Sequence, residues 1–551
     1  MTVSDDLVGV FERAGIDHVF GFPCEQMEPY YASIAESDVR HVLARSEASA
    51  ALMADAYART GDAVGVCDGV GGPGAAYISV GLVEAAGACS PVLALTGDND
   101  SAFRGREVIQ DADNEAILDP HVSASYDPEG PDRVVEAAAN ALREAAGGVP
   151  GPTHVNLTED LLGADGDADT AVAAAGATLD PASLPVPDEE SVAAIADLLA
   201  DAERPVLLCG EGAVRAEAFE EVHDLAHTAG APVVTSMNGK GIVAETDPCA
   251  AGVAGRWGYC QVANDLLEAA DAIVGLGCRF GDLTTVGWSL VPDDAALVHV
   301  DLDPHWLGHN YAVDLPVQAD ARATADRVHA ALEDRAVDPG DRIDEVADEY
   351  ADWRDSFAGV LESDASPIKP QRVVTELHAA TPPETILCSA TSFPGFFTGA
   401  FYQVREAGPR YLQARGSDGI NVCLPHAIGA QVANPDTPVV AVSGDGGIGY
   451  HIADLETAAR EDLPLTVVVF NNQSLGSSKA SMLTNVGVDQ STDFHPEVDY
   501  AAVARGFGCE GQVVTEVDEL GDALAEAVAS DAPTLLDVHV DPNAFPPVLV
   551  D

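Results

Sequence analysis

The chain has 551 residues, with 26 lysines and arginines against 91 aspartates and glutamates, and its formal net charge is −65. This length is too great for one hydrophobic core and predicts about three domains. The charge excludes binding to a nucleic-acid backbone as a main role, because two polyanions repel each other. The acidic residues are spread over the whole chain. This predicts a halophilic protein that works in multimolar salt, where the Debye length falls to about 3 Å; the alternative is an acidic protein of ordinary solubility.

Neither the N-terminus nor the cysteines indicate export. The first residues carry no basic region followed by an apolar run, and no apolar stretch reaches the ~20 residues that span a bilayer. The 10 cysteines form no Cys-x-x-Cys pair, so we expect most of them to be reduced and buried. These features predict a soluble, cytoplasmic protein that contacts no membrane.

Three segments with alternating helical and strand patterns follow one another along the chain. The first covers residues 1–165, with buried strands expected at 17–21 and 91–97 and an alanine-rich helix at 46–59. Residues 164–188 have the Ala, Asp, Gly and Pro composition of a linker. The second segment, 188–335, contains expected strands at 205–208, 232–235, 272–277 and 297–301. An acidic helical connection at about 335–365 leads to the third segment, 365–551. We therefore predict an α/β protein with three doubly wound parallel sheets, the first and third alike.

The third segment contains the most informative motif of the chain. The run Val439–Ser443 reads as a buried parallel strand and is followed by Gly444, Asp445, Gly446 and Gly447. Residues 448–460 have helical spacing, 465–470 form the next strand, and Asn471 and Asn472 follow it. Ligands of such sheets bind at the carboxyl ends of the strands. Oxygen atoms from Asp445, Asn472 and the backbone carbonyl near Ser474 suit Mg²⁺ bound to phosphate, and the glycines let backbone N–H groups approach it.

This order of strand, Gly-Asp-Gly, helix, strand and Asn-Asn resembles the thiamine-diphosphate (ThDP) fingerprint of the acetolactate synthase and 2-oxo acid decarboxylase family. The resemblance extends over most of the chain. It implies a pyrimidine-binding first domain, a Rossmann-like central domain and a diphosphate-binding third domain. It also implies that Glu47, at the start of an alanine-rich helix, hydrogen-bonds the aminopyrimidine ring of ThDP and activates the cofactor. The simpler alternative for Glu47 is a first-turn glutamate favoured by the helix dipole.

The resemblance implies further contacts and an assembly. Ile420 occupies the position of the apolar residue that supports the bent cofactor, and the carbonyl of Asp418 would accept a hydrogen bond from its amino group. A plain core role is the alternative for Ile420. In this family the activating glutamate and the diphosphate site belong to different subunits, so we expect a homodimer or homotetramer. A small regulatory subunit is a further possible partner.

The positions that would face the substrate depart from acetolactate synthases. The first active-site loop reads Pro23-Cys24-Glu25 where Pro-Gly-Gly is usual, so Glu25 falls where simple decarboxylases place an acid/base group. Gln110 follows the family pattern and is the other expected substrate contact. The resemblance implies an enzyme that decarboxylates a small 2-oxo acid and transfers the enamine carbon to a carbonyl acceptor. A simple decarboxylase using Glu25 and an inactive homologue with a regulatory or structural role are the alternatives.

Two further hypotheses concern other ligands. Arg104, Arg106 or Lys479 could bind an anionic group of the substrate, or could instead pair with the abundant surface acids. The middle segment has Gly-x-Gly after two of its strands, at Gly210–Gly212 and Gly275–Gly277. In acetolactate synthases the corresponding domain carries a structural FAD, whereas in other relatives it carries nothing or an adenine nucleotide. FAD is therefore one possible cofactor.

Overall fold

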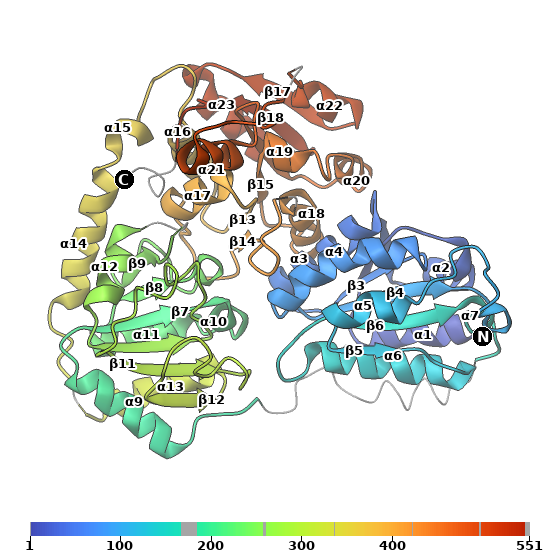
Figure 1. Cartoon of the computed structure of the whole chain (residues 1–551), viewed down its shortest axis with the longest axis horizontal. Coiled ribbons are helices and arrows are strands. Elements are labelled where there is room, and N and C mark those ends of the chain that lie inside the picture. Colours follow the sequence, from blue (N-terminus) through green and yellow to red (C-terminus); the bar gives the residue numbers. More distant parts are fainter. Residues whose placement is uncertain are drawn as a thin grey trace.

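The computed structural model describes residues 2–166, 184–256, 260–335, 337–420, 422–494 and 497–545, so most of the expected linker at 164–188 lies outside the described residues. It contains three six-stranded sheets, and every strand pair within them is parallel. The three sheet-bearing segments follow the chain and lie around a common centre (Figure 1). The predicted α/β class with three parallel sheets is confirmed. No helix in the described ranges has the length and apolarity needed to cross a membrane.

In the first sheet, successive strands are added first on one side of β1 and then on its other side. Its order is β2-β1-β3-β4-β6-β5. The chain passes from β1 outward to β2 and then returns to β3 on the other side of β1, which makes the β1/β3 boundary a topological switch point. The strands are β1 (His18–Gly21), β2 (Arg40–Leu43), β3 (Gly65–Gly69), β4 (Val92–Asp98), β5 (Ala124–Tyr126) and β6 (Thr153–Thr158). The helices are α1 (Val3–Arg13), α2 (Glu28–Ala35), α3 (Glu47–Thr60), α4 (Pro73–Gly87), α5 (Asn114–Leu118), α6 (Pro131–Ala146) and α7 (Glu159–Leu162).

The third sheet repeats that topology, as the sequence predicted. Its order is β14-β13-β15-β16-β18-β17, which places the corresponding switch point between β13 and β15. The strands are β13 (Ile386–Ser389), β14 (Tyr411–Gln413), β15 (Val439–Gly444), β16 (Thr466–Asn471), β17 (Glu510–Val514) and β18 (Thr534–His539). The helices are α16 (Pro370–Ala380), α17 (Phe393–Phe401), α18 (Cys423–Ala433), α19 (Asp445–Ile448), α20 (Asp454–Arg460), α21 (Gly476–Val486), α22 (Tyr500–Gly506) and α23 (Val517–Val528).

The middle sheet has a different order, β12-β11-β10-β7-β8-β9. Read from β9, this is the 3-2-1-4-5-6 order of dinucleotide-binding folds, with its switch point between β7 and β10. The strands are β7 (Pro205–Cys209), β8 (Val233–Thr235), β9 (Ala250–Val253), β10 (Ala272–Leu276), β11 (Ala296–Asp301) and β12 (Leu315–Gln318). The helices are α9 (Glu189–Asp201), α10 (Glu211–Arg215), α11 (Phe219–Ala229), α12 (Gln261–Ala269) and α13 (Ala321–Glu333).

Two expected helical regions differ in detail from the structure. The connection expected at 335–365 contains α14 (Arg342–Asp355) and the short α15 (Ala358–Leu361), and α14 runs along the edge of the molecule towards the third sheet (Figure 1). The helix expected at 448–460 is interrupted. A single turn, α19, is followed by a turn at 449–453, and α20 begins at Asp454.

Helix α3 joins the first and third segments into one apolar core. Ser46 caps its N-terminus by accepting a hydrogen bond from the Ser49 amide at 3.1 Å, and the helix is buried on nearly all sides. Its small side chains allow very close neighbours. A Cβ added to Gly429 of α18 would lie 2.1 Å from the carbonyl oxygen of Met53, and one added to Gly81 of α4 would lie 2.5 Å from Ala51. The core around α3 therefore continues from the first sheet into the third.

Candidate functional site

The predicted diphosphate residues surround one cavity at the switch point of the third sheet. The cavity measures about 50 Å³ and lies where β13, β15 and β16 end. Its lining includes nearly every residue that the sequence singled out in this segment: Gly444, Asp445, Gly446, Gly447, Asn472, Ser474 and Ile420. Segments separated by more than a hundred residues therefore meet at the edge of the sheet where such folds bind ligands.

Asp445 is a buried carboxyl group without a basic partner. It is 4% exposed, its Oδ1 accepts from the Gly446 amide at 3.0 Å, and its Oδ2 has no hydrogen-bond partner among the described residues. Burial raises the pKa of Asp445 to about 7, although the backbone amides of Gly446, Gln473 and Ser474 lower it. A buried carboxylate with an unpaired oxygen is costly unless a cation binds it. This environment fits a metal ligand.

The two asparagines after β16 have different surroundings. Asn471 donates to Asp537 Oδ1 at 2.9 Å and is buried in the sheet. Asn472 lines the cavity, and its Oδ1 accepts from the Ser474 amide at 3.1 Å. The hydroxyl of Ser474 is also buried without a partner in the described ranges. Asn472 is thus the member of the pair whose amide oxygen lies where it could be offered to a cation in the cavity.

The backbone directly after Asp445 leaves no room for additional side chains. A Cβ on Gly446 would meet Leu475 at 2.7 Å, and one on Gly447 would meet the carbonyl oxygen of Ile420 at 2.3 Å. Ile420 is half-buried and lines the cavity, so a pure core role does not describe it. These close approaches fit a cradle for phosphate groups made from main-chain N–H donors.

Asp418 lies beside the cavity rather than in its lining. Its carbonyl oxygen accepts from the Thr391 hydroxyl at 3.2 Å, and its carboxylate accepts from Arg415 Nη1 at 2.5 Å. Its φ is +56°, and Ser392 and Gln473, which flank the cavity, have φ values of +68° and +57°. Backbone strain of this kind at residues other than glycine is typical of functional sites.

Glu47 is the second buried carboxyl group that lacks a cation. It is 8% exposed and forms no ion pair with another described residue. Burial raises the pKa of Glu47 above its ordinary value, and the carboxylate of Asp68 raises it further. Its side chain packs against the end of β3 and the start of α4, because a Cβ on Gly69 would meet its Cγ at 2.6 Å and one on Gly74 would meet its Oε1 at 3.0 Å. Glu47 is absent from the lining of the Asp445 cavity of its own chain.

The loop between β3 and α4 contacts the neighbour of one expected substrate residue and the backbone of the other. Gln26, next to Glu25, accepts from the Gly71 amide at 3.0 Å, and the carbonyl oxygen of Gln110 lies 3.1 Å from the Cβ position of Gly72. The side chains of Glu25 and Gln110 are exposed. Gly71 and Gly72 therefore lie next to Gln26 and to the backbone of Gln110.

Sequence reasoning missed the residues that fix the start of α3. Ser49 Oγ lies 2.8 Å from His451 Nδ1 and donates to Asp454 Oδ2 at 2.5 Å. The Arg45 amide donates to Asp454 Oδ1 at 3.1 Å. This buried network ties the helix that carries Glu47 to the turn between α19 and α20. The partners are about 400 positions apart, so no local pattern could have indicated it.

Two of the three candidate anion-binding residues, Arg104 and Lys479, are engaged with acids, whereas Arg106 is exposed and its role stays a hypothesis. Arg104 donates two hydrogen bonds to Asp127, at 2.6 and 2.7 Å, and also pairs with Asp98. Lys479 pairs with Asp493 at 2.7 Å and with Asp489 at 3.4 Å. For these two residues the alternative of surface pairing fits the structure better than substrate binding.

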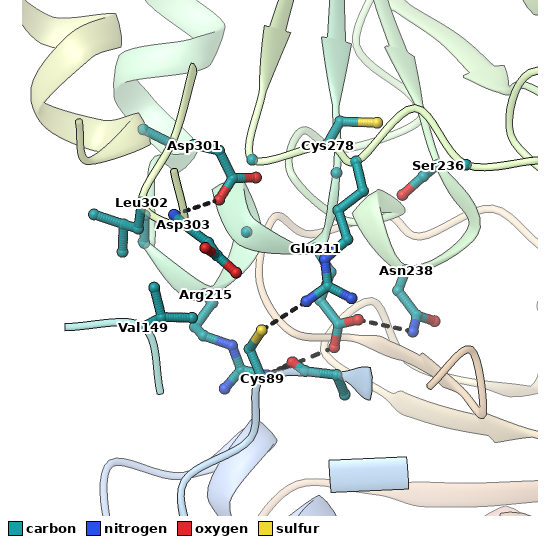
Figure 2. A pocket seen from close by; sticks show the side chains of 18 of the residues that line it. Cys89, Val149, Glu211, Arg215, Ser236, Asn238, Cys278, Asp301, Leu302 and Asp303 are labelled. Carbon is teal, nitrogen blue, oxygen red and sulfur yellow. Dashed lines mark hydrogen bonds and ion pairs between the residues drawn. The ribbon is translucent and has the colours of Figure 1, made fainter. Parts of the chain in front are cut away.

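A larger cavity of about 510 Å³ lies between the three segments, at the switch point of the middle sheet. Figure 2 shows Asp301, Leu302 and Asp303 on one side of it and Glu211 and Asn238 on the other. The glycine loops after β7 and β10 touch here, since a Cβ on Gly210 would lie 2.1 Å from the Gly277 carbonyl oxygen. Arg215 and Arg279 also line the cavity.

Comparisons with known proteins agree with this architecture. Three family models match in sequence: the thiamine pyrophosphate enzyme N-terminal TPP binding domain at residues 1–117, the central domain at 192–328 and the C-terminal TPP binding domain at 395–538. These matches fall in turn on the three sheet-bearing segments.

Several curated relatives align along almost their whole length. A probable acetolactate synthase large subunit of Methanococcus aeolicus is 30% identical, over 99% of this chain and 93% of the relative. A protein of the same name from Methanocaldococcus jannaschii is 30% identical over 100% and 93%. The acetolactate synthase isozyme 2 large subunit of Escherichia coli is 28% identical over 97% and 95%. The chain belongs to the thiamine pyrophosphate enzymes, in the family that includes the acetolactate synthase large subunits.

Proposed function

We propose that the protein catalyses a reaction of the acetolactate synthase type, in which a small 2-oxo acid is decarboxylated and the remaining fragment is joined to a carbonyl acceptor. The observation that carries this proposal is the cavity around Asp445 and Asn472, in a chain whose relatives are named acetolactate synthase large subunits. Those names favour neither a simple decarboxylase using Glu25 nor an inactive partner protein.

The proposed roles follow from the chemistry of each group. Asp445, Asn472 and the Ser474 carbonyl would hold Mg²⁺, and the main chain at Gly444–Gly447 would bind the diphosphate of ThDP. The partnerless Oδ2 of Asp445 and the close contacts at Gly447 support this assignment. Ile420 would pack against the cofactor, and the second lone pair of the Asp418 carbonyl would accept a hydrogen bond from it.

Glu47 would keep the cofactor reactive. When bound, ThDP supplies a carbon nucleophile that also takes up the electron pair released with CO₂. Burial raises the pKa of Glu47, which would favour a proton shared between its carboxyl group and the pyrimidine ring, and the same burial would keep that hydrogen bond away from water. Gln110 and Glu25 would contact the substrate and orient it.

A second copy of the chain would complete each site. Among the described residues Glu47 does not line the cavity around Asp445 of its own chain, which supports a homodimer or homotetramer with shared sites. Tyr77 and Val80 of α4, together with Tyr450, are large exposed apolar side chains that such an interface would cover. The names of the relatives as large subunits support a small regulatory subunit as an additional partner. In this assembly residues 1–165, 188–335 and 365–551 act as pyrimidine-binding, central and diphosphate-binding domains.

The 510 Å³ cavity is the proposed site of an adenine-containing cofactor, FAD being the one that the resemblance suggests. The position at the switch point of a 3-2-1-4-5-6 sheet supports this. The carboxylate of Asp301 at the end of β11 suits ribose hydroxyls, and Arg215 and Arg279 suit phosphates. FAD would have a structural role here.

The protein is also proposed to be halophilic and to work in the cytoplasm. All three lysines of the chain form ion pairs with acids: Lys240, Lys369 and Lys479. These few pairs leave most of the acidic residues without a lysine partner, and the net charge is −65. The 10 cysteines are free thiols, as expected in a reducing compartment.

The first prediction concerns Glu47→Gln. We expect about a 10²–10⁴-fold loss of ThDP-dependent CO₂ release from a panel of 2-oxo acids, with cofactor binding and oligomeric state retained. Glu159→Gln, an exposed first-turn glutamate of α7, is the control and should keep full activity. Product analysis for acetolactate separates ligation from plain decarboxylation. Full turnover in Glu47→Gln would contradict the assigned role.

The second prediction concerns the middle cavity. Protein purified without added cofactor and then denatured should release an adenine-containing compound, and a flavin absorbance band would identify it as FAD. Asp301→Ala should lower the amount released, because the ribose hydroxyls lose their acceptor. A denatured supernatant that absorbs in neither the flavin nor the adenine band would contradict the proposal.

The third prediction concerns salt. The midpoint of thermal unfolding should rise as KCl increases from millimolar to multimolar concentration, because screening removes repulsion among the surface carboxylates. Circular dichroism at a series of KCl concentrations measures it. A midpoint that stays constant or falls with salt would show that the acidic surface is not an adaptation to salt.

A further inference from the structure

Two histidines and an aspartate converge on the surface of the middle segment, away from both cavities described above. His223 and His227 are four residues apart on α11, so they lie on one face of the helix, with ring centroids 4.5 Å apart. Asp247 belongs to the loop that leads into β9. His223 Nε2 lies 3.2 Å from Asp247 Oδ2, and His227 Nε2 lies 3.0 Å from Asp247 Oδ1. All three side chains are partly exposed and can be reached from solvent.

Both ring nitrogens of His223 face carboxylate oxygens, which favours a cation at this position. Its Nδ1 lies 3.0 Å from Asp224 Oδ1, while its Nε2 faces Asp247. A neutral imidazole carries only one N–H, so one of its nitrogens would direct a lone pair at a carboxylate oxygen. Either a second proton or a metal ion between His223 and Asp247 removes this repulsion.

We propose that His223, His227 and Asp247 bind a divalent transition-metal ion such as Zn²⁺, with water completing its coordination. Two ligands at about 2.0–2.1 Å from a tetrahedral ion are roughly 3.3 Å apart, close to the N···O separations observed here. In the described part of the chain this is the one group of three metal-ligating side chains whose ligand atoms all lie within 4.8 Å of one another.

The ligand types select the class of metal. Imidazole nitrogens favour Zn²⁺, Ni²⁺ or Co²⁺, whereas Mg²⁺ and Ca²⁺ favour sets of oxygen ligands. Asp224 would hold Nδ1–H of His223 and leave Nε2 free to coordinate, in the carboxylate–histidine–metal arrangement common in metal sites. The site is therefore chemically distinct from the proposed Mg²⁺ position at Asp445.

The bound ion would have a structural effect. It would link α11 to the loop at 240–249, which also carries the buried ion pair of Lys240 with Glu245. Glu245 in turn accepts from the Val404 amide at 2.7 Å, and its own amide donates to the Val404 carbonyl. The ion would thus stabilise the loop through which the middle segment contacts the third segment.

The fourth prediction is tested on the full-length protein saturated with ThDP and Mg²⁺ in high KCl, so that oxygen-rich sites are filled. Titration with Co²⁺ should give visible absorption bands of a four-coordinate site that saturate at one ion per chain, and Zn²⁺ should abolish them. His227→Ala and Asp247→Asn should each weaken Co²⁺ binding at least tenfold, and Asp224→Asn about tenfold. Zn²⁺ should raise the unfolding midpoint of the unaltered protein but not that of His227→Ala.

His305 and His309 provide the matched control. They are also four residues apart, with ring centroids at 5.0 Å, but they belong to no such ligand group in the described ranges. The double variant His305→Ala/His309→Ala should bind Co²⁺ as the unaltered protein does. Absence of the bands in the unaltered protein, or equal binding by His227→Ala, would overturn the proposal. An unfolding midpoint of metal-free His227→Ala equal to that of the metal-free parent establishes that the variant is folded.

Discussion

The site depends on the burial of one small-residue helix, α3, between the first and third segments. Alanines let α4 and α18 approach to the point where a Cβ on Gly81 or Gly429 would collide with backbone. Polar networks fix both ends of the helix. At the N-terminal end Ser49 bonds His451 and Asp454. At the C-terminal end Arg59 forms ion pairs with three acids, Asp55, Glu84 and Glu211. A helix held at both ends cannot rotate, and this fixes the direction in which Glu47 points.

The two carboxyl groups that we propose to serve the cofactor have similar surroundings. Glu47 and Asp445 are buried, and burial raises the pKa of each. Two other buried acids, Asp55 and Glu245, are instead paired with the bases Arg59 and Lys240. Buried acids left without cations are costly for stability, and such local violations are expected where a ligand supplies the missing partner.

The sequence was most informative about features that depend on residues close together in the chain. The apolar run 439–443, the glycines after it and Asn472 predicted a βαβ unit and its ligand edge, because strand periodicity and turn chemistry are written in consecutive residues. The break between α19 and α20, the pairing of Arg104 with Asp127 and the contacts of Ser49 could not be read from it. Each is decided by a partner brought near only by folding, and a single sequence carries no record of such pairs. Most residues that line the Asp445 cavity were thus predictable from the sequence, whereas the contacts that hold the helix of Glu47 were not.

The central claim is that each site combines Glu47 of one subunit with Asp445 of another. Co-expression of Glu47→Gln and Asp445→Asn chains tests it most directly, because a mixed dimer of the two would contain one intact site and one doubly altered site. Each variant alone should be nearly inactive, and the mixture should recover about a quarter of the activity of the unaltered enzyme by random pairing. A mixture as inactive as its components would contradict the account, since it would mean that both residues act within one chain.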